Sequence, residues 1–319
     1  MRVKRVYIFL TGGLGNQLFQ IAAAKSLNPE EIKVITSVGH PRINSSGRAD
    51  VLSLNIGEEV SEYKVKHENR FVSKIFGYLI RSSINPTRLE LIYLRRLMRC
   101  IAAVILKYEI NDKFKIHHAE DIGFTDLDVD TDKILLIGYF QSHKYLEKIR
   151  QGGLERKISI FNQNMSEDIE APSFNQSKLI VHFRLGDYKF DKSFGVINPS
   201  YYLRAISKIL NKHSFDEILI FSDEINLARK LLSINFIGKI TWVDSQEYDT
   251  ISSFQLMRQG HAFIIGNSTF SWWAASLSLN KPWTVIAPDP WFAGLPEPRH
   301  LIPNDWDRIK ADFILSKLD

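Results

Sequence analysis

The sequence predicts an α/β protein made of two Rossmann-like, doubly wound domains that face a cleft. Three observations carry this prediction. Short apolar runs alternate with helical patterns, as in mostly parallel sheets. Several of these runs end abruptly in glycine or polar residues, which is typical of strands that deliver ligand-binding groups to one edge of a sheet. The length of 319 residues suffices for two domains. The polar stretch 162–176 is the best linker candidate, so we place the domains at 1–172 and 173–319.

The first strand–turn–helix unit lies near the start of the chain. Residues 6–10 (VYIFL) are apolar and predict a buried strand, and a glycine-containing turn, TGGLGN, follows at 11–16. Residues 17–27 then predict an alanine-rich helix that Asn28-Pro29 ends.

This glycine turn does not match a dinucleotide-binding fingerprint. Leu18 stands where the third glycine belongs, and the next strand, 32–35, ends in Thr36 instead of a ribose-binding acid. A P-loop is also excluded, because no Gly-Lys-Ser/Thr follows. Two interpretations remain: a polar-ligand site in which a helix start presents Asn16 and Gln17, or an ordinary helix cap.

The second unit begins with the most informative stretch, SKLIVHFRLGDY at 177–188. Its apolar residues predict a buried strand, and polar side chains follow at the strand's carboxyl end. Because strand side chains alternate, His182 and Arg184 share one face. An arginine beside an imidazole suits an anionic ligand, phosphate above all. The alternative is a strand-end arginine paired with a neighbouring carboxylate, and a guanidinium buried against an internal acid would not fit the ligand-binding role.

The remaining elements continue the same alternation of strands and helices. In chain order we expect a helix at 201–210, a strand at 218–221, a helix to about 232, and strands at 240–243, 262–265 and 285–287.

Two of these strand ends carry further candidates for a ligand site. Asp223 follows the strand at 218–221, where its carboxylate either caps a helix or accepts donors from a guanine or a ribose. Ser268 and Thr269 open a helix after Gly266, where hydroxyls, amides and the helix dipole favour phosphate. The neighbouring Trp272-Trp273 pair is expected in the core.

Composition narrows the class of protein. The chain is 45% hydrophobic with a formal charge of +5, and its single cysteine excludes a disulfide framework or a cysteine metal site. No apolar run approaches the length of a membrane span, so we expect a cytoplasmic protein. Residues 64–115 hold twelve Lys/Arg against four acids. A solvated helix face is favoured there over a surface drawn to anionic lipid of the inner membrane, and no nucleic-acid-binding motif accompanies the charge.

The sequence gives little support for a metal site or for covalent catalysis. The acidic run DLDVDTD at 126–132 lacks the glycine and glutamate of a calcium loop, so we favour a solvated turn, although the spacing does not exclude a D-x-D metal motif. His117-His118 lack a partner at ligand spacing and are expected at the surface. The sequence contains no nucleophile elbow, H-E-x-x-H or kinase loop.

Taken together, these motifs resemble those of glycosyltransferase family 11, the GDP-fucose-dependent α-1,2-fucosyltransferases, in its bacterial form. The resemblance spans most of the chain except about 40–135. The matching segments are GGLGNQLFQIAAAKSL (12–27), GYFQSHKY (138–145), VHFRLGDY (181–188), FSDE (221–224), IIGNSTFSWWAASL (264–277), NKPWTVIAPDPWF (280–292) and LIPNDW (301–306).

The resemblance implies a GT-B-type fold, GDP-fucose as donor substrate, inversion at the fucose carbon, and neither a metal nor another cofactor. It implies an acceptor-side N-terminal domain and a GDP-fucose-binding C-terminal domain. Arg184 would grip the donor diphosphate, and His182 would lie against the nucleotide. Ser268 and Thr269 would cradle phosphate.

The resemblance also implies places for three further residues. Asp223 would border the nucleotide pocket, and Asn16 and Gln17 would face the cleft from the other domain. Two positions depart from the family pattern. Leu185 replaces a second arginine, but strand parity turns it away from Arg184. Ser253 replaces an acid, for which Asp249 is a candidate substitute.

The function that follows is transfer of L-fucose to the 2-hydroxyl of a terminal β-galactoside in a glycan such as a lipid-linked bacterial O-antigen repeat. The alternative within the same chemistry is another inverting GDP-fucose transferase acting on a glycan core or a protein. Outside transferase chemistry, the hypotheses are a sugar- or nucleic-acid-binding protein and an NAD-linked oxidoreductase, which the missing third glycine and ribose acid oppose. Asp187 is the first candidate for the general base, followed by Asp191 and His143.

Overall fold

The computed structural model describes residues 3–36, 42–43, 47–63, 97, 101, 113–119, 121–127, 129–151, 176–244 and 247–314. The expected linker, the predicted boundary at 172/173 and most of the basic segment 64–115 lie outside these residues. The chain divides into two compact units: Met1–Gln163 with Pro298–Leu301, and Asn164–Glu297 with Ile302–Asp319. The expectation that the two units face a cleft stays a prediction.

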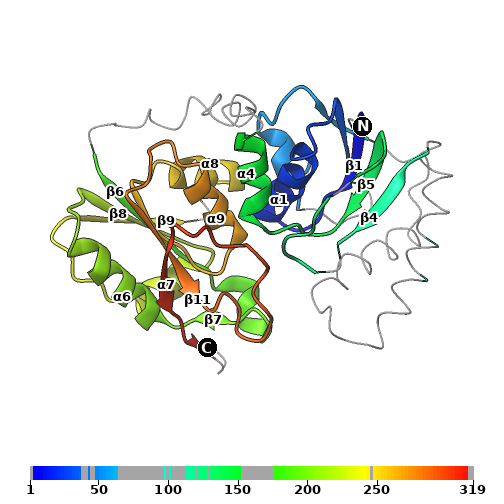
Figure 1. Cartoon of the computed structure of the whole chain (residues 1–319). Helices are drawn as coiled ribbons and strands as arrows, with labels where there is room; N and C mark the ends of the chain where they lie inside the picture. The colour runs from blue at the N-terminus through cyan, green and yellow to red at the C-terminus, as the bar shows by residue number, and fades with distance from the viewer. Residues whose placement is uncertain are drawn as a thin grey trace. The chain divides into compact units, whose positions relative to one another are not determined.

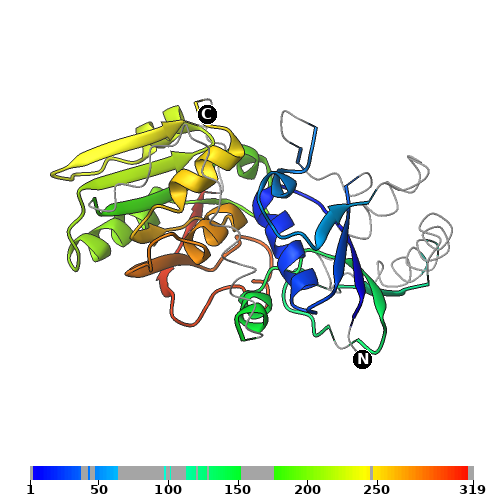
Figure 2. The same cartoon turned by 90° about the horizontal axis from the view of Figure 1, so that it is seen from above.

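The first unit contains a five-stranded parallel sheet in the order β3-β2-β1-β5-β4. Its central strands are apolar and buried, as expected for a parallel sheet. The helices α1 and α4 pack beside one another in this unit (Figures 1 and 2). The element bounds are β1 Arg5–Phe9, α1 Leu14–Lys25, β2 Glu31–Ile35, the 3-10 helix η1 Asp50–Ser53, β3 Val60–Glu62, β4 Lys115–His118, β5 Lys133–Ile137 and α4 His143–Gln151.

The second unit contains a six-stranded parallel sheet in the order β12-β11-β10-β6-β8-β9. The chain runs from β6 outward through β8 and β9, then returns to β10 on the other side of β6. The topological switch point therefore lies between β6 and β10, where open α/β sheets bind ligands at the carboxyl ends of the strands.

The strands of this unit are β6 Lys178–Phe183, β7 Val196–Ile197, β8 Glu217–Ser222, β9 Lys239–Asp244, β10 Ala262–Ile264, β11 Thr284–Asp289, β12 Asp307–Lys310 and β13 Phe313–Ile314. The helices are the 3-10 helix η3 Gly186–Phe190, α6 Pro199–Leu210, α7 Ile225–Leu231, α8 Thr250–Met257 and α9 Thr269–Ser276. β7 and β13 form a separate antiparallel pair.

These two sheets confirm the predicted α/β class with two Rossmann-like units. Two boundaries differ in ways that matter for the site. β6 extends to Phe183, so His182 lies inside the strand and not after it. α1 begins at Leu14, so Asn16 and Gln17 lie in its first turn. In the part of the chain that the structure describes, no helix combines the length and apolar character needed to cross a bilayer.

Candidate functional site

Three loops meet at the switch point of the second sheet. They follow β6, β8 and β10, and β6 lies between β8 and β10 in the sheet. Gly266, just after β10, lies directly against the end of β6, because a Cβ atom there would stand 3.0 Å from the carbonyl oxygen of His182. Glycine at this position therefore lets the two loops approach closely.

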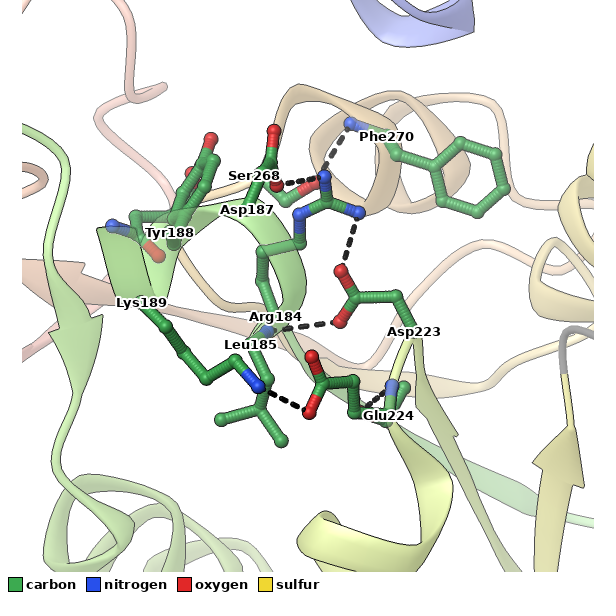
Figure 3. A network of polar contacts seen from close by, with 11 residues as sticks. Arg184, Leu185, Asp187, Tyr188, Lys189, Asp223, Glu224, Ser268 and Phe270 are labelled. Carbon is green, nitrogen blue, oxygen red and sulfur yellow. Dashed lines mark hydrogen bonds and ion pairs between the residues drawn. The ribbon is translucent and has the colours of Figure 1, made fainter. Parts of the chain in front are cut away.

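Arg184 is the charged centre of this site (Figure 3). Its guanidinium forms two ion pairs, at 2.8 Å from Nη1 to Oδ2 of Asp223 and at 2.5 Å from Nη2 to Oδ1 of Asp187. The ring of Tyr188 lies 5.2 Å from the guanidinium carbon, within cation–π range. Burial alone would lower the pKa of Arg184, but the charges of Asp223 and Asp187 outweigh it and hold that pKa above its usual value. The guanidinium therefore stays charged.

Asp223 is a partly buried acid. Its ion pair with Arg184 would count against ligand binding if it made the guanidinium inaccessible. It does not close it off completely. The Arg184 side chain keeps 20% of its surface exposed, and its second partner, Asp187, is 72% exposed. One side of the guanidinium is thus fixed inside the protein, and the other faces an exposed carboxylate.

Asp223 is held by both of its oxygens. Oδ1 accepts a hydrogen bond of 2.9 Å from the backbone amide of Leu185, and Oδ2 pairs with Arg184. The Cα of Gly186 lies against the same carboxylate, since a Cβ there would stand 3.0 Å from Cγ of Asp223. Asp223 therefore positions Arg184, and its direct contact with a nucleotide stays a prediction. Leu185 is fully buried, in agreement with the expectation that it turns away from Arg184.

The rest of η3 is anchored by residues that were not among the candidates predicted from the sequence. Lys189 pairs with Glu224 at 2.6 Å, next to Asp223 at the end of β8. The Tyr188 hydroxyl donates to the carbonyl of Asn267 at 3.2 Å, and its ring stacks on Phe194. These residues lie within or beside the motifs VHFRLGDY and FSDE, but only the strand order reveals that the two motifs are in contact.

His182 is buried and its ring lies 6.0 Å from that of Phe270. Its Nδ1 atom has no hydrogen-bond partner among the described residues. Burial, and next the charge of Arg184, lower the pKa of His182 to about 3. The imidazole is therefore neutral near pH 7, so it adds no positive charge to the site and Arg184 supplies it.

Ser268 caps α9 through a hydrogen bond of 3.3 Å from the Phe270 amide to its hydroxyl oxygen. Thr269 is the first residue of that helix. Since Asn267 contacts Tyr188 and Phe270 contacts His182, this helix start belongs to the Arg184 site. The neighbouring Trp272 and Trp273 are buried, which confirms their predicted place in the core.

Asn16 and Gln17 belong to the first unit. The amide of Gln17 donates to the carbonyls of Gly12 and Arg42 and accepts from the Val51 amide at 2.9 Å, so it links three backbone segments. Oδ1 of Asn16 accepts from Gln141 at 3.0 Å. The structure gives Gln17 a structural part, and contact of either residue with a ligand stays a prediction.

The structure also shows where the candidate metal ligands and the alternative general bases lie. Within the described ranges, no three His, Cys, Asp or Glu side chains gather as metal ligands do. His118 is buried on β4, so its expected place at the surface was wrong: β4 pairs with β5 and the side chain turns inward. Asp191 accepts from the Ser193 amide, and Asp249 caps α8. His143 is buried, with Nε2 3.1 Å from Glu147.

The chain matches one sequence family and resembles several known proteins. The sequence model of Glycosyl transferase family 11 matches residues 5–294. The O-antigen biosynthesis glycosyltransferase WbnK of Escherichia coli is 26% identical, over 91% of this chain and 95% of its own length. An α-1,2-colitosyltransferase of Escherichia coli is also 26% identical, over 89% and 91% respectively. Among solved structures, a mutant of Arabidopsis thaliana FUT1 in complex with GDP matches with a TM-score of 0.48 and 11% identity, over 96% of this chain and 76% of its own.

Proposed function

Since the chain belongs to glycosyltransferase family 11, we propose that it transfers L-fucose from GDP-fucose, with inversion, to the 2-hydroxyl of a terminal β-galactoside. The observation that carries this proposal is Arg184, a charged guanidinium at the switch point of the second sheet, with one side fixed by Asp223. A diphosphate bound there would also meet the start of α9, where Ser268 and Thr269 offer hydroxyls and the helix offers amides.

The proposed chemistry explains why a fixed cation is needed. Breaking the bond between the anomeric carbon and the phosphate oxygen leaves negative charge on GDP and positive charge on the sugar ring. Donors that are already in place stabilise this charge without reorganising during the reaction. Arg184 satisfies this requirement, because Asp223 and the Tyr188 ring hold its guanidinium in one position.

The acceptor hydroxyl must lose its proton as it attacks, and we keep Asp187 as the proposed base. In the structure Oδ1 of its carboxylate contacts Arg184 and the side chain is 72% exposed, so the acceptor hydroxyl would approach its other oxygen. Asp191 and His143 remain the second and third candidates.

The names of the relatives support a glycan repeat as the acceptor. Both curated relatives come from Escherichia coli, and one is named for O-antigen biosynthesis, which favours a glycan repeat as the acceptor. If that acceptor is lipid-linked, the basic segment 64–115 would suit contact with an anionic membrane surface. The colitosyltransferase favours a second candidate function, transfer of colitose, which is fucose without its 3-hydroxyl. The third candidate function is that of another inverting GDP-fucose transferase, which would transfer fucose to a glycan core or a protein.

The test incubates the purified protein, in EDTA, with GDP-fucose or GDP-colitose and a panel of acceptors that contains galactose-terminated glycans, glycan cores and proteins. We expect an α-1,2-fucosylated product, identified by NMR, in the presence of EDTA. Preference for GDP-colitose would select the second candidate. Transfer only to glycan cores or proteins would select the third, and absence of transfer from both sugar nucleotides would contradict the proposal.

A further inference from the structure

The two acids that pair with Arg184 are held in different ways. Asp223 is confined: its oxygens bind the Leu185 amide and the guanidinium, and the Gly186 backbone lies against it. The Asp187 carboxylate is 72% exposed, and among the described residues Arg184 is its partner for hydrogen bonding and ion pairing. Asp187 can therefore leave Arg184 by rotating into solvent, whereas Asp223 cannot.

We propose that the Asp187 carboxylate occupies the position on Arg184 that the donor diphosphate takes, and that donor binding displaces it. This inference rests on the proposed function, in which Arg184 binds the diphosphate. Carboxylate and phosphate oxygens use the same N–H donors of a guanidinium. Because Asp223 holds Nη1, the Nη2 side is the one that can exchange its partner.

The formal charges at the site favour this exchange. Arg184 contributes one positive charge and Asp187 and Asp223 contribute two negative charges, so the three side chains together carry a net charge of −1. His182 adds nothing, because its low pKa keeps it neutral. A diphosphate that entered beside both carboxylates would meet repulsion, whereas a diphosphate that replaced Asp187 would find a free side of the guanidinium.

The movement can stay local to one side chain. The Lys189–Glu224 ion pair and the Tyr188–Asn267 hydrogen bond hold η3 next to the Asp187 position. These contacts do not involve the Asp187 carboxylate, so the backbone can keep its place while that carboxylate turns outward.

This arrangement lowers the apparent affinity for the donor. Only molecules in which Asp187 has left Arg184 can bind the diphosphate fully, and apparent affinity falls by the fraction of such molecules. An exposed ion pair of ordinary strength shifts this equilibrium by about two- to fivefold. Asp187→Asn, which removes the competing charge, should therefore bind GDP about two- to fivefold more tightly.

The experiment measures binding of GDP and of guanosine by calorimetric titration to wild type, Asp187→Asn, Asp191→Asn and Arg184→Lys. We expect Asp187→Asn to bind GDP more tightly and guanosine unchanged, because guanosine has no phosphate to compete. Asp191→Asn is the matched control: it removes a nearby charge that contacts the Ser193 amide and not Arg184, so it should match wild type.

The outcomes separate this inference from the function on which it rests. Equal or weaker GDP binding by Asp187→Asn, in a protein with unchanged circular dichroism, overturns the displacement. An equal gain for guanosine also overturns it, because the effect would then not concern the phosphates. If Arg184→Lys binds GDP as wild type does, the proposed function of Arg184 fails instead.

Discussion

At the scale of single residues, the site depends on Arg184 staying charged and partly exposed. Burial opposes the charge of Arg184, and two carboxylates restore it. His182 behaves in the opposite way, because it is buried without an acidic partner and stays neutral. The sequence motif that contains both residues therefore provides one cation, Arg184, and one uncharged ring, His182.

Arg184→Ala should lower kcat by about 10²–10³, equivalent to about 2.7–4 kcal/mol of transition-state stabilisation, because the departing diphosphate loses a fixed donor. Arg184→Lys should retain part of the activity, since it keeps the charge but loses the planar fork. Steady-state kinetics with GDP-fucose would measure both, with circular dichroism to confirm folding. A folded alanine variant with near-normal turnover would contradict the role.

The low pKa of His182 makes a second residue-scale prediction, about stability. The folded state keeps this imidazole neutral down to about pH 3, whereas the unfolded chain takes up a proton below about pH 6.5. Protonation thus favours the unfolded state, and stability falls as pH falls through this window by up to about 1.4 kcal/mol per pH unit.

We therefore expect the free energy of unfolding of wild type to drop by about 1.6 kcal/mol more than that of His182→Asn between about pH 6.5 and pH 5. Urea unfolding at both pH values measures the difference. Contributions from His143 and His261, whose pKa values burial also lowers, are common to both proteins and cancel. Parallel pH profiles for the two proteins would refute this account of His182.

At the scale of elements, the sequence predicted the strands well and their contacts poorly. β6, β8 and β10 were recognisable because each is a short apolar run that ends in polar residues or glycine. The sequence offered a strand-end arginine paired with a carboxylate as an alternative, but it did not identify Asp223 as that partner, because the pair depends on β6 and β8 being neighbours with Phe183 opposite Ser222. Asp223 therefore looked like a ligand contact in the sequence, and the sheet register showed its part in positioning Arg184.

The start of α9 allows a prediction with a matched control. Ser268→Ala removes the cap of α9, and Asn198→Ala removes the corresponding cap of α6, where Asn198 accepts from the Ser200 amide at 3.0 Å. Each should cost about 0.5–2 kcal/mol of stability. Only Ser268→Ala should also weaken GDP binding, because its hydroxyl belongs to the proposed phosphate site. Denaturation and calorimetric titration check the two effects. Equal GDP affinities in both variants would exclude Ser268 from the donor site.

At the scale of the whole molecule, the two units are not two consecutive pieces of sequence. Pro298–Leu301 belongs to the first unit although the chain on either side of it belongs to the second. The carbonyl of His300 accepts from the His143 amide and the Ser142 hydroxyl, and the carbonyl of Arg299 accepts from the Phe124 amide. These are mostly backbone contacts, which leave no side-chain pattern, so the sequence did not predict them.

Gly123 tests whether this segment holds the first unit together. A Cβ at Gly123 would clash with the backbone nitrogen of Arg299 and stand 2.9 Å from the carbonyl carbon of Pro298. Backbone cannot move aside as a flexible side chain can. We therefore expect Gly123→Ala to destabilise the protein by about 1–3 kcal/mol.

Hydrogen exchange identifies the cause of that loss. The amide of His143 is protected by the carbonyl of His300, and this bond opens if the segment Pro298–Leu301 is pushed away. In Gly123→Ala the His143 amide should exchange faster than the overall loss of stability explains. The amides that pair β1 with β2 lie within the sheet, so their exchange should change only by as much as global unfolding does. A destabilised variant with an unchanged His143 rate would show that the strain is absorbed elsewhere. In that case the segment Pro298–Leu301 would not contribute to the stability of the first unit.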